Sequence, residues 1–155
     1  MIMKRTFILL IYACLCALLG AQTLKPITWE VYGLTFKAPV GLIVEEETED
    51  LLLLNNSQFY IEVHPLVTEE MEVEMKTLLE DIAEEDQISN RSEVETFELP
   101  HFQAAVLKGK MEDDFCCNVS LKSKETNDVF YISIVYNTIV KENVLEEMLK
   151  SFSIE

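Results

Sequence analysis

The residues most able to do chemistry in this sequence are two adjacent cysteines, Cys116 and Cys117, and its two histidines, His64 and His101. Side chains of successive strand residues point to opposite faces, so the two sulfurs are held apart and close no ordinary disulfide. We therefore expect two reduced thiols, one in the core and one on the other face. The alternative is a metal- or thiol-active protein, in which the fold gathers these side chains into a zinc-like set or leaves the thiols reactive.

Motifs for other chemistries do not occur in the sequence. It contains no Gly-x-Ser-x-Gly elbow, no His-x-x-x-His pair and no glycine-rich phosphate loop. Its acidic runs at 45–50, 69–74 and 80–86 lack the alternating ligands and central glycine of a calcium loop. We therefore predict no catalytic residue, no cofactor-binding residue, no metal ligand and no enzymatic activity.

The first 21 residues have the layout of a secretory signal peptide. Lys4 and Arg5 precede an uncharged apolar run, 6–20, which is shorter than the roughly 18 to 20 residues needed to span a bilayer. The run ends in small residues, and we place the cleavage site after Ala21. The alternative is a bacterial lipoprotein anchored through Cys14, which follows a loose lipobox.

Cleavage would leave residues 22–155 as a single, strongly acidic domain. The whole chain has 12 basic and 28 acidic residues and a net charge of −16. The signal contains two of the basic residues and none of the acidic ones, so the mature chain carries −18. Because this charge repels nucleic-acid phosphates and anionic lipids, we expect a protein or small-ligand partner, no nucleic acid, and no membrane insertion after cleavage.

Hydrophobic patterns in the first half of the domain predict short strands and then a helix. Strands are expected at 27–31, 34–38, 42–46, 51–54 and 58–64. Tyr32 and Gly33 between the first two predict a hairpin. Apolar residues at spacings of three and four then predict an amphipathic helix with Thr68 as its N-cap, fading near Asp86.

The second half returns to strands and closes with a helix. Strands are expected at 94–99, 103–111, 115–123 and 129–137, and apolar residues from Val144 to Phe152 predict the helix. The run 129–136 is apolar on both faces except at Ser133, so we place it centrally in the sheet. This order predicts the α+β class, an antiparallel β-sheet with one long helix between strand blocks and a C-terminal helix packed on the sheet.

Both ends of the domain carry short motifs of a known family. The segment 29–41, WEVYGLTFKAPVG, resembles the opening hairpin and Pro-x-Gly turn of the PsbP-like fold family, and strand 131–136 with the helix ending at Phe152 resembles its close. The family includes PsbP of photosystem II, a Ran-binding nuclear import factor and exported bacterial proteins such as the DcrB-like group. Leu42 departs from the pattern, since members commonly have tryptophan there. The resemblance implies a helix-covered antiparallel sheet that binds other proteins without catalysis.

Signal, motifs and resemblance lead to one hypothesis and two alternatives. The hypothesis is an exported, non-enzymatic binding or adaptor domain, periplasmic or secreted in a bacterium, that binds a protein or a small ligand through one face of its sheet or through a groove between sheet and helix. The first alternative is the metal- or thiol-active periplasmic protein that uses Cys116 and Cys117. The second is a lipid-anchored structural subunit of the envelope, attached through Cys14.

Overall fold

Ten strands and two helices form the part of the chain that the structure, a computed structural model, describes: residues 23–66, 74–137, 140 and 142–155. The strands are β1 (Leu24–Trp29), β2 (Leu34–Pro39), β3 (Ile43–Glu47), β4 (Leu52–Asn55), β5 (Phe59–Leu66), β6 (Glu95–Glu98), β7 (Phe102–Met111), β8 (Asp114–Ser123), β9 (Val129–Tyr136) and β10 (Ser153–Ile154). The helices are α2 (Met75–Glu85) and α3 (Glu142–Leu149). The expected signal peptide, 1–21, and the lipoprotein residue Cys14 lie outside the described residues.

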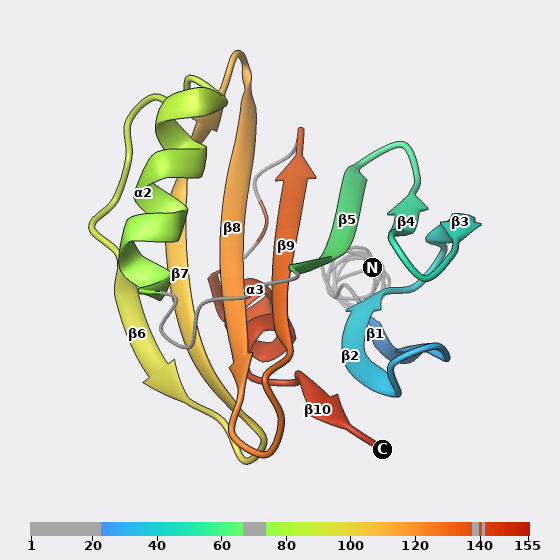
Figure 1. Ribbon diagram of the computed structural model, residues 1–155. Coiled ribbons are helices and arrows are strands. Elements are labelled where there is room, and N and C mark those ends of the chain that lie inside the picture. Colours follow the sequence, from blue (N-terminus) through green and yellow to red (C-terminus); the bar gives the residue numbers. More distant parts are fainter. Residues whose placement is uncertain (1–22, 67–73, 138–139, 141) are drawn as a thin grey trace, which may run out of the picture.

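The strands form two antiparallel sheets (Figure 1). The large sheet has seven strands in the order β3-β4-β5-β9-β8-β7-β6, and the small sheet has three in the order β1-β2-β10. Gly41, with a positive φ of 94°, lies in the turn that leads the chain from β2 of the small sheet to β3 of the large one. Glycine suits this position because it has no Cβ to clash.

Helix α2 covers one face of the large sheet, while α3 and the small sheet cover the other (Figure 1). Alternating side chains of the strands supply the two apolar layers that these elements bury. On β8, Cys117, Val119 and Leu121 face α3 and the small sheet, whereas Cys116 lies with Leu79 and Ala83 of α2. The large sheet is therefore the central layer of three, and both its faces are available to position side chains.

The predicted α+β class is confirmed, and so is the central place of β9, which pairs with β5 and β8. The predicted hairpin is also present, with Trp29 opposite Leu34. The domain has two sheets where one was expected, because β2 pairs with β10 at the far end of the chain and not with the large sheet.

The first helix that the structure describes begins at Met75. Glu74 has an extended backbone, φ −74° and ψ 98°, so α2 begins after it at Met75. The Glu74 carboxylate accepts a hydrogen bond of 3.0 Å from the Thr77 hydroxyl. Thr68, the expected N-cap, lies outside the described residues. Neither α2 nor any other helix of the described part has the length and apolar character that crossing a membrane requires.

Candidate binding groove

The two adjacent cysteines occupy opposite faces of β8, as predicted, and both are free and buried. Complete burial raises the pKa of Cys117 to about 12, and burial also raises the pKa of Cys116. Reactive cysteines require the opposite change, a lowered pKa that supplies thiolate at neutral pH. The surroundings of these thiols therefore do not favour nucleophilic or redox chemistry.

The two histidines lie apart from the cysteines, each beside its own acid. The His64 Nε2 atom on β5 is 3.0 Å from a Glu62 carboxylate oxygen, and His101 Nδ1, in the turn between β6 and β7, is 3.2 Å from Glu125. The described residues contain no group of three or more His, Cys, Asp or Glu side chains able to hold a metal ion. The fold thus does not assemble the zinc-like set of the first alternative within the part of the chain it describes.

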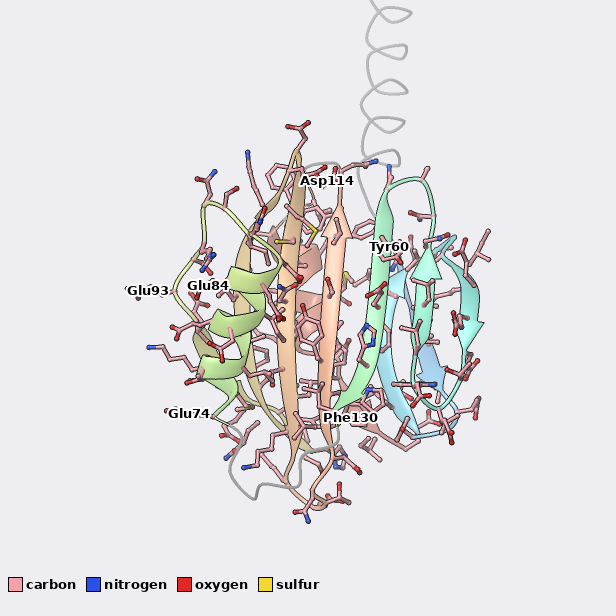
Figure 2. The ribbon with its side chains drawn as sticks, turned by 45° about the horizontal axis from the view of Figure 1, so that its top comes forward. Tyr60, Glu74, Glu84, Glu93, Asp114 and Phe130 are labelled. Carbon is pink, nitrogen blue, oxygen red and sulfur yellow. The ribbon has the colours of Figure 1, made fainter. Side chains whose placement is uncertain are left out.

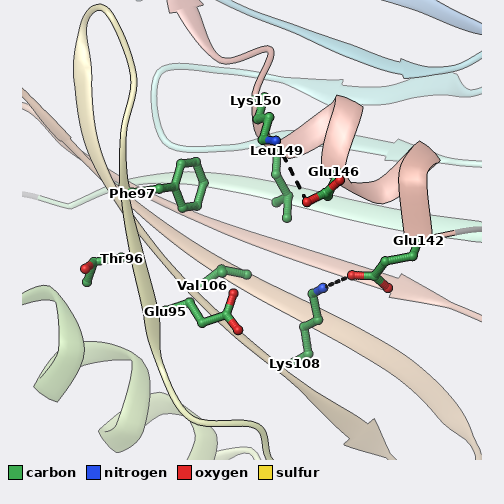
Figure 3. A pocket seen from close by; sticks show the side chains of 9 residues that line it. All are labelled: Glu95, Thr96, Phe97, Val106, Lys108, Glu142, Glu146, Leu149 and Lys150. Atoms are coloured by element: carbon green, nitrogen blue, oxygen red, sulfur yellow. Dashed lines mark hydrogen bonds and ion pairs between the residues drawn. The ribbon is translucent and has the colours of Figure 1, made fainter.

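A groove lies between the β6 edge of the large sheet and helix α3 (Figure 3). Its apolar lining consists of the side chains of Phe97 of β6, Val106 of β7 and Leu149 of α3, and its cavity has a volume of about 180 Å³. Phe97 lies across from Ala104 in the sheet, and the alternation of β6 places Glu95 on the same side as Phe97. The groove is therefore an apolar slot with charged side chains along it.

Two ion pairs and one further carboxylate give the groove its charge (Figure 3). Lys108 pairs with Glu142, and Lys150 Nζ lies 3.8 Å from a Glu146 carboxylate oxygen. Burial acts to lower the pKa of Lys108, but the hydrogen bond and charge of Glu142 outweigh it, so the pKa is raised and the amine stays charged. Each lysine is thus balanced by a glutamate. The charge of the Glu95 carboxylate also acts on Lys108, but Glu95 forms no ion pair among the described residues, so the groove has one carboxylate more than it has lysines paired.

The β6 side of the groove is also a sheet edge. Among the described strands β6 pairs with β7 alone, so one side of its backbone has no strand beside it. Such an edge can accept an extended segment as an added strand, while a neighbouring pocket takes one of its side chains. Between an edge strand and a helix, this groove offers main-chain pairing, apolar contact and a negative charge.

None of the groove residues was identified from the sequence. Lys108 and Glu142, its closest ion pair, are separated by 34 positions and belong to a strand and a helix. An isolated Lys or Glu among the chain's many charged residues has no distinguishing local pattern. One local signal could have drawn attention to the site. Strand β6 has only four residues, Glu95–Glu98, and two of them are glutamates. A short, charged strand is typical of a sheet edge.

A family model described as dihydro-orotase-like matches residues 40–143. The solved structure of the Ran-binding protein Mog1p of Saccharomyces cerevisiae has a TM-score of 0.60 with the chain, at 14% identity, over 86% of this chain and 96% of Mog1p. A mutant of protein Mog1 has a TM-score of 0.58 at 14% identity, over 85% and 96%. No curated protein is significantly similar to the chain in sequence. At such low identity, the likeness to Mog1p shows a common fold.

The family match corrects one expectation. Placement among the exported bacterial PsbP-like and DcrB-like proteins is wrong, because the family model that matches two thirds of the chain is a different one. The motifs behind that placement are a hairpin with a Pro-x-Gly turn and a closing strand and helix. These features are short and structural, so they indicate a fold and do not separate one family of that fold from another.

Proposed function

The chain belongs to the dihydro-orotase-like family, and we propose that it is a non-enzymatic adaptor that binds an extended basic segment of a partner protein in the groove between β6 and α3. The observation that carries the proposal is the combination of the edge strand β6, which pairs on one side only among the described strands, with an apolar, negatively charged slot beside it. The Mog1p fold supports a binding role, since the solved relative of that fold is described as a Ran-binding protein.

The basic character of the partner follows from charge complementarity. The whole chain carries −16, and in the groove the charges of Lys108 and Lys150 are balanced by Glu142 and Glu146. A lysine or arginine of an added strand would find the Glu95 carboxylate next to its backbone position. The same overall charge disfavours nucleic acid and anionic membranes as partners.

A synthetic peptide of alternating lysine and valine, labelled for fluorescence anisotropy, tests this proposal. We expect binding at about 0.15 M salt, where distant charges are screened, and a loss of about tenfold in affinity for Glu95→Lys, because it places a like charge in the slot. Glu93→Lys is the matched control, since it makes the same charge change at an exposed position outside the groove and should alter the affinity by less than about twofold.

Two results would overturn the proposal. Equal losses for Glu95→Lys and Glu93→Lys, or no binding by the unaltered protein, would show that the groove is not the binding site. Hydrolysis of dihydro-orotate by the purified protein, lost on changing any one side chain, would show that the protein is an enzyme.

We further propose that the protein works outside the cytoplasm, on the strength of the charged start and apolar run of residues 1–21. In the host cell, the mature protein is then expected to begin at Gln22. Intact-mass measurement of the protein isolated from its host decides this. A mass that includes residues 1–21 would contradict cleavage of a signal peptide. A mass that matches a chain starting at Cys14 with added acyl groups would instead indicate a lipid anchor.

A further inference from the structure

Helix α2 is held on the large sheet by little buried carbon. Of its 11 residues only Leu79 and Ala83 are buried, whereas α3, with 8 residues, buries four on the opposite face. Glu74, just before the first turn of α2 (Figure 2), makes no side-chain hydrogen bond that caps the helix. Because an isolated helix of this length is marginal in water, its packing on the sheet decides how firmly α2 is held.

The charges of α2 act against the helix. Glu84 follows Glu80 by four residues and is therefore its neighbour on the helix surface, and Asp81 and Glu85 form a second pair of like charges with the same separation. The last turn contains no basic residue, so its acids meet the negative end of the helix dipole without compensation. The ion pair within the helix, Lys76 with Glu80 at 3.9 Å, is exposed and contributes little.

The face of the large sheet under α2 is partly polar. Asn118 and Ser120 alternate with the core residues of β8, so their side chains point to the same face as Cys116, toward α2. Both are 0% exposed, and neither the amide of Asn118 nor the hydroxyl of Ser120 makes a hydrogen bond within the described part of the chain. Burying an unpaired amide is costly, and water would pair with it once α2 moved away.

The chain that follows α2 is attached firmly. Gln87 has a positive φ of 55°, and after it Ser89 exchanges two backbone hydrogen bonds of 2.8 Å with Lys110 of β7. Ile88 between them is buried against Gly109, where a Cβ would lie only 2.4 Å from the Ile88 side chain. A fixed point therefore lies directly beyond the weakly held helix.

We propose that α2 opens as a hinged unit, loosened by the unpaired polar side chains beneath it. It detaches from the large sheet about the Ser89–Lys110 bridge while both sheets and α3 stay folded, and it thereby exposes Cys116, Asn118 and Ser120. Elements with little packing open at a lower free-energy cost than the whole domain. The proposal concerns the face opposite the groove between β6 and α3, so it does not depend on the proposed function.

Labelling of single-cysteine variants with N-ethylmaleimide tests the proposal. One full-length variant carries Cys14→Ser, Cys16→Ser and Cys117→Ala, and the other carries Cys116→Ala in place of Cys117→Ala. Each labelling rate is compared with the rate that global unfolding of the same variant permits, which follows from its urea unfolding curve. We expect Cys117 to react at that rate and Cys116 to react at least about tenfold faster, since it lies under α2.

Two further changes, each made in both single-cysteine variants, separate opening of α2 from global unfolding. Val144→Ala, a control on the α3 face, should speed the labelling of Cys117 by about tenfold and leave that of Cys116 within about twofold. Asn118→Leu should slow the labelling of Cys116 by about tenfold, because carbon of similar size replaces the unpaired amide.

Three results would each overturn the proposal. Equal rates for the two thiols, or equal gains for both with Val144→Ala, would show that Cys116 is exposed only when the whole domain unfolds. Unchanged labelling of Cys116 with Asn118→Leu would show that the polar side chains do not loosen α2.

Discussion

Replacing Trp29 with alanine is expected to lower the free energy of unfolding by about 4 kcal/mol, because truncating a fully buried aromatic side chain typically costs 3 to 5 kcal/mol. Trp29 ends β1 in the small sheet and packs edge-to-face against Phe130 of β9 in the large sheet, with ring centroids 6.3 Å apart. Its Nε1–H also donates a hydrogen bond of 2.9 Å to the carbonyl of Thr48. Alanine would leave a cavity between the sheets and an unpaired carbonyl.

Urea unfolding followed by circular dichroism measures this effect. A loss of about 4 kcal/mol is a large share of the roughly 5 to 15 kcal/mol that stabilises an ordinary domain. Trp29→Phe is the matched variant: it keeps most of the apolar contact and removes the hydrogen bond to Thr48, so we expect a loss of about 1 to 3 kcal/mol. If Trp29→Ala unfolded at the same urea concentration as the unaltered protein, Trp29 would not join the two sheets.

The second large effect is a loss of stability at alkaline pH. Burial raises the pKa of Cys117 from its ordinary value of 9.0 to about 12, and it raises the pKa of Tyr136 to about 12. In the unfolded chain these groups ionise at lower pH than in the folded one. Above about pH 9 the folded state thus holds more protons, and its stability falls as pH rises.

For Cys117 the contribution is fully present below pH 9.0 and is lost as the pH approaches about 12. Since each pKa unit corresponds to about 1.4 kcal/mol, the thiol accounts for about 4 kcal/mol over this range. Urea unfolding at about pH 8 and about pH 11 measures the decline. Cys117→Ala should show a shallower decline because it has one ionising group fewer, and an identical decline in this variant would contradict the assignment of the effect to Cys117.

Long strands could be predicted closely from local pattern. The strand expected at 129–137 is β9, Val129–Tyr136, and the one expected at 103–111 is β7, Phe102–Met111. In β5, Phe59, Ile61 and Val63 alternate with polar residues in the sequence, and these three side chains face the core. Alternation works here because the period of two is a property of the extended backbone itself and is repeated over many residues.

Short or irregular elements could not be predicted in this way. Strand β10 has two residues, Ser153 and Ile154, and exists because they pair with Thr35 and Leu34 near the other end of the chain. For β10, contacts between the two ends of the domain outweighed a weak local preference.

Some features of the candidate sites could also be predicted from the sequence, and others could not. That Cys116 and Cys117 point to opposite faces was predictable, because adjacent residues of a strand always do. That both are buried depends on α2 covering one face and α3 with the small sheet covering the other. The meeting of Glu95, Lys108 and Glu142 in one groove depends on pairing between distant strands and a helix, and no local pattern encodes it.

The sequence by itself determined the α+β class, the positions of the long strands, the alternation of side chains between the two faces of each strand and the acidic character of the molecule. Each of these depends on neighbouring residues or on a sum over the chain. Only the tertiary structure decided the division into two sheets, the edge position of β6 and the groove between β6 and α3. These features arise from contacts between residues far apart in the chain, whose free energies depend on packing and pairing that exist only once the fold has formed.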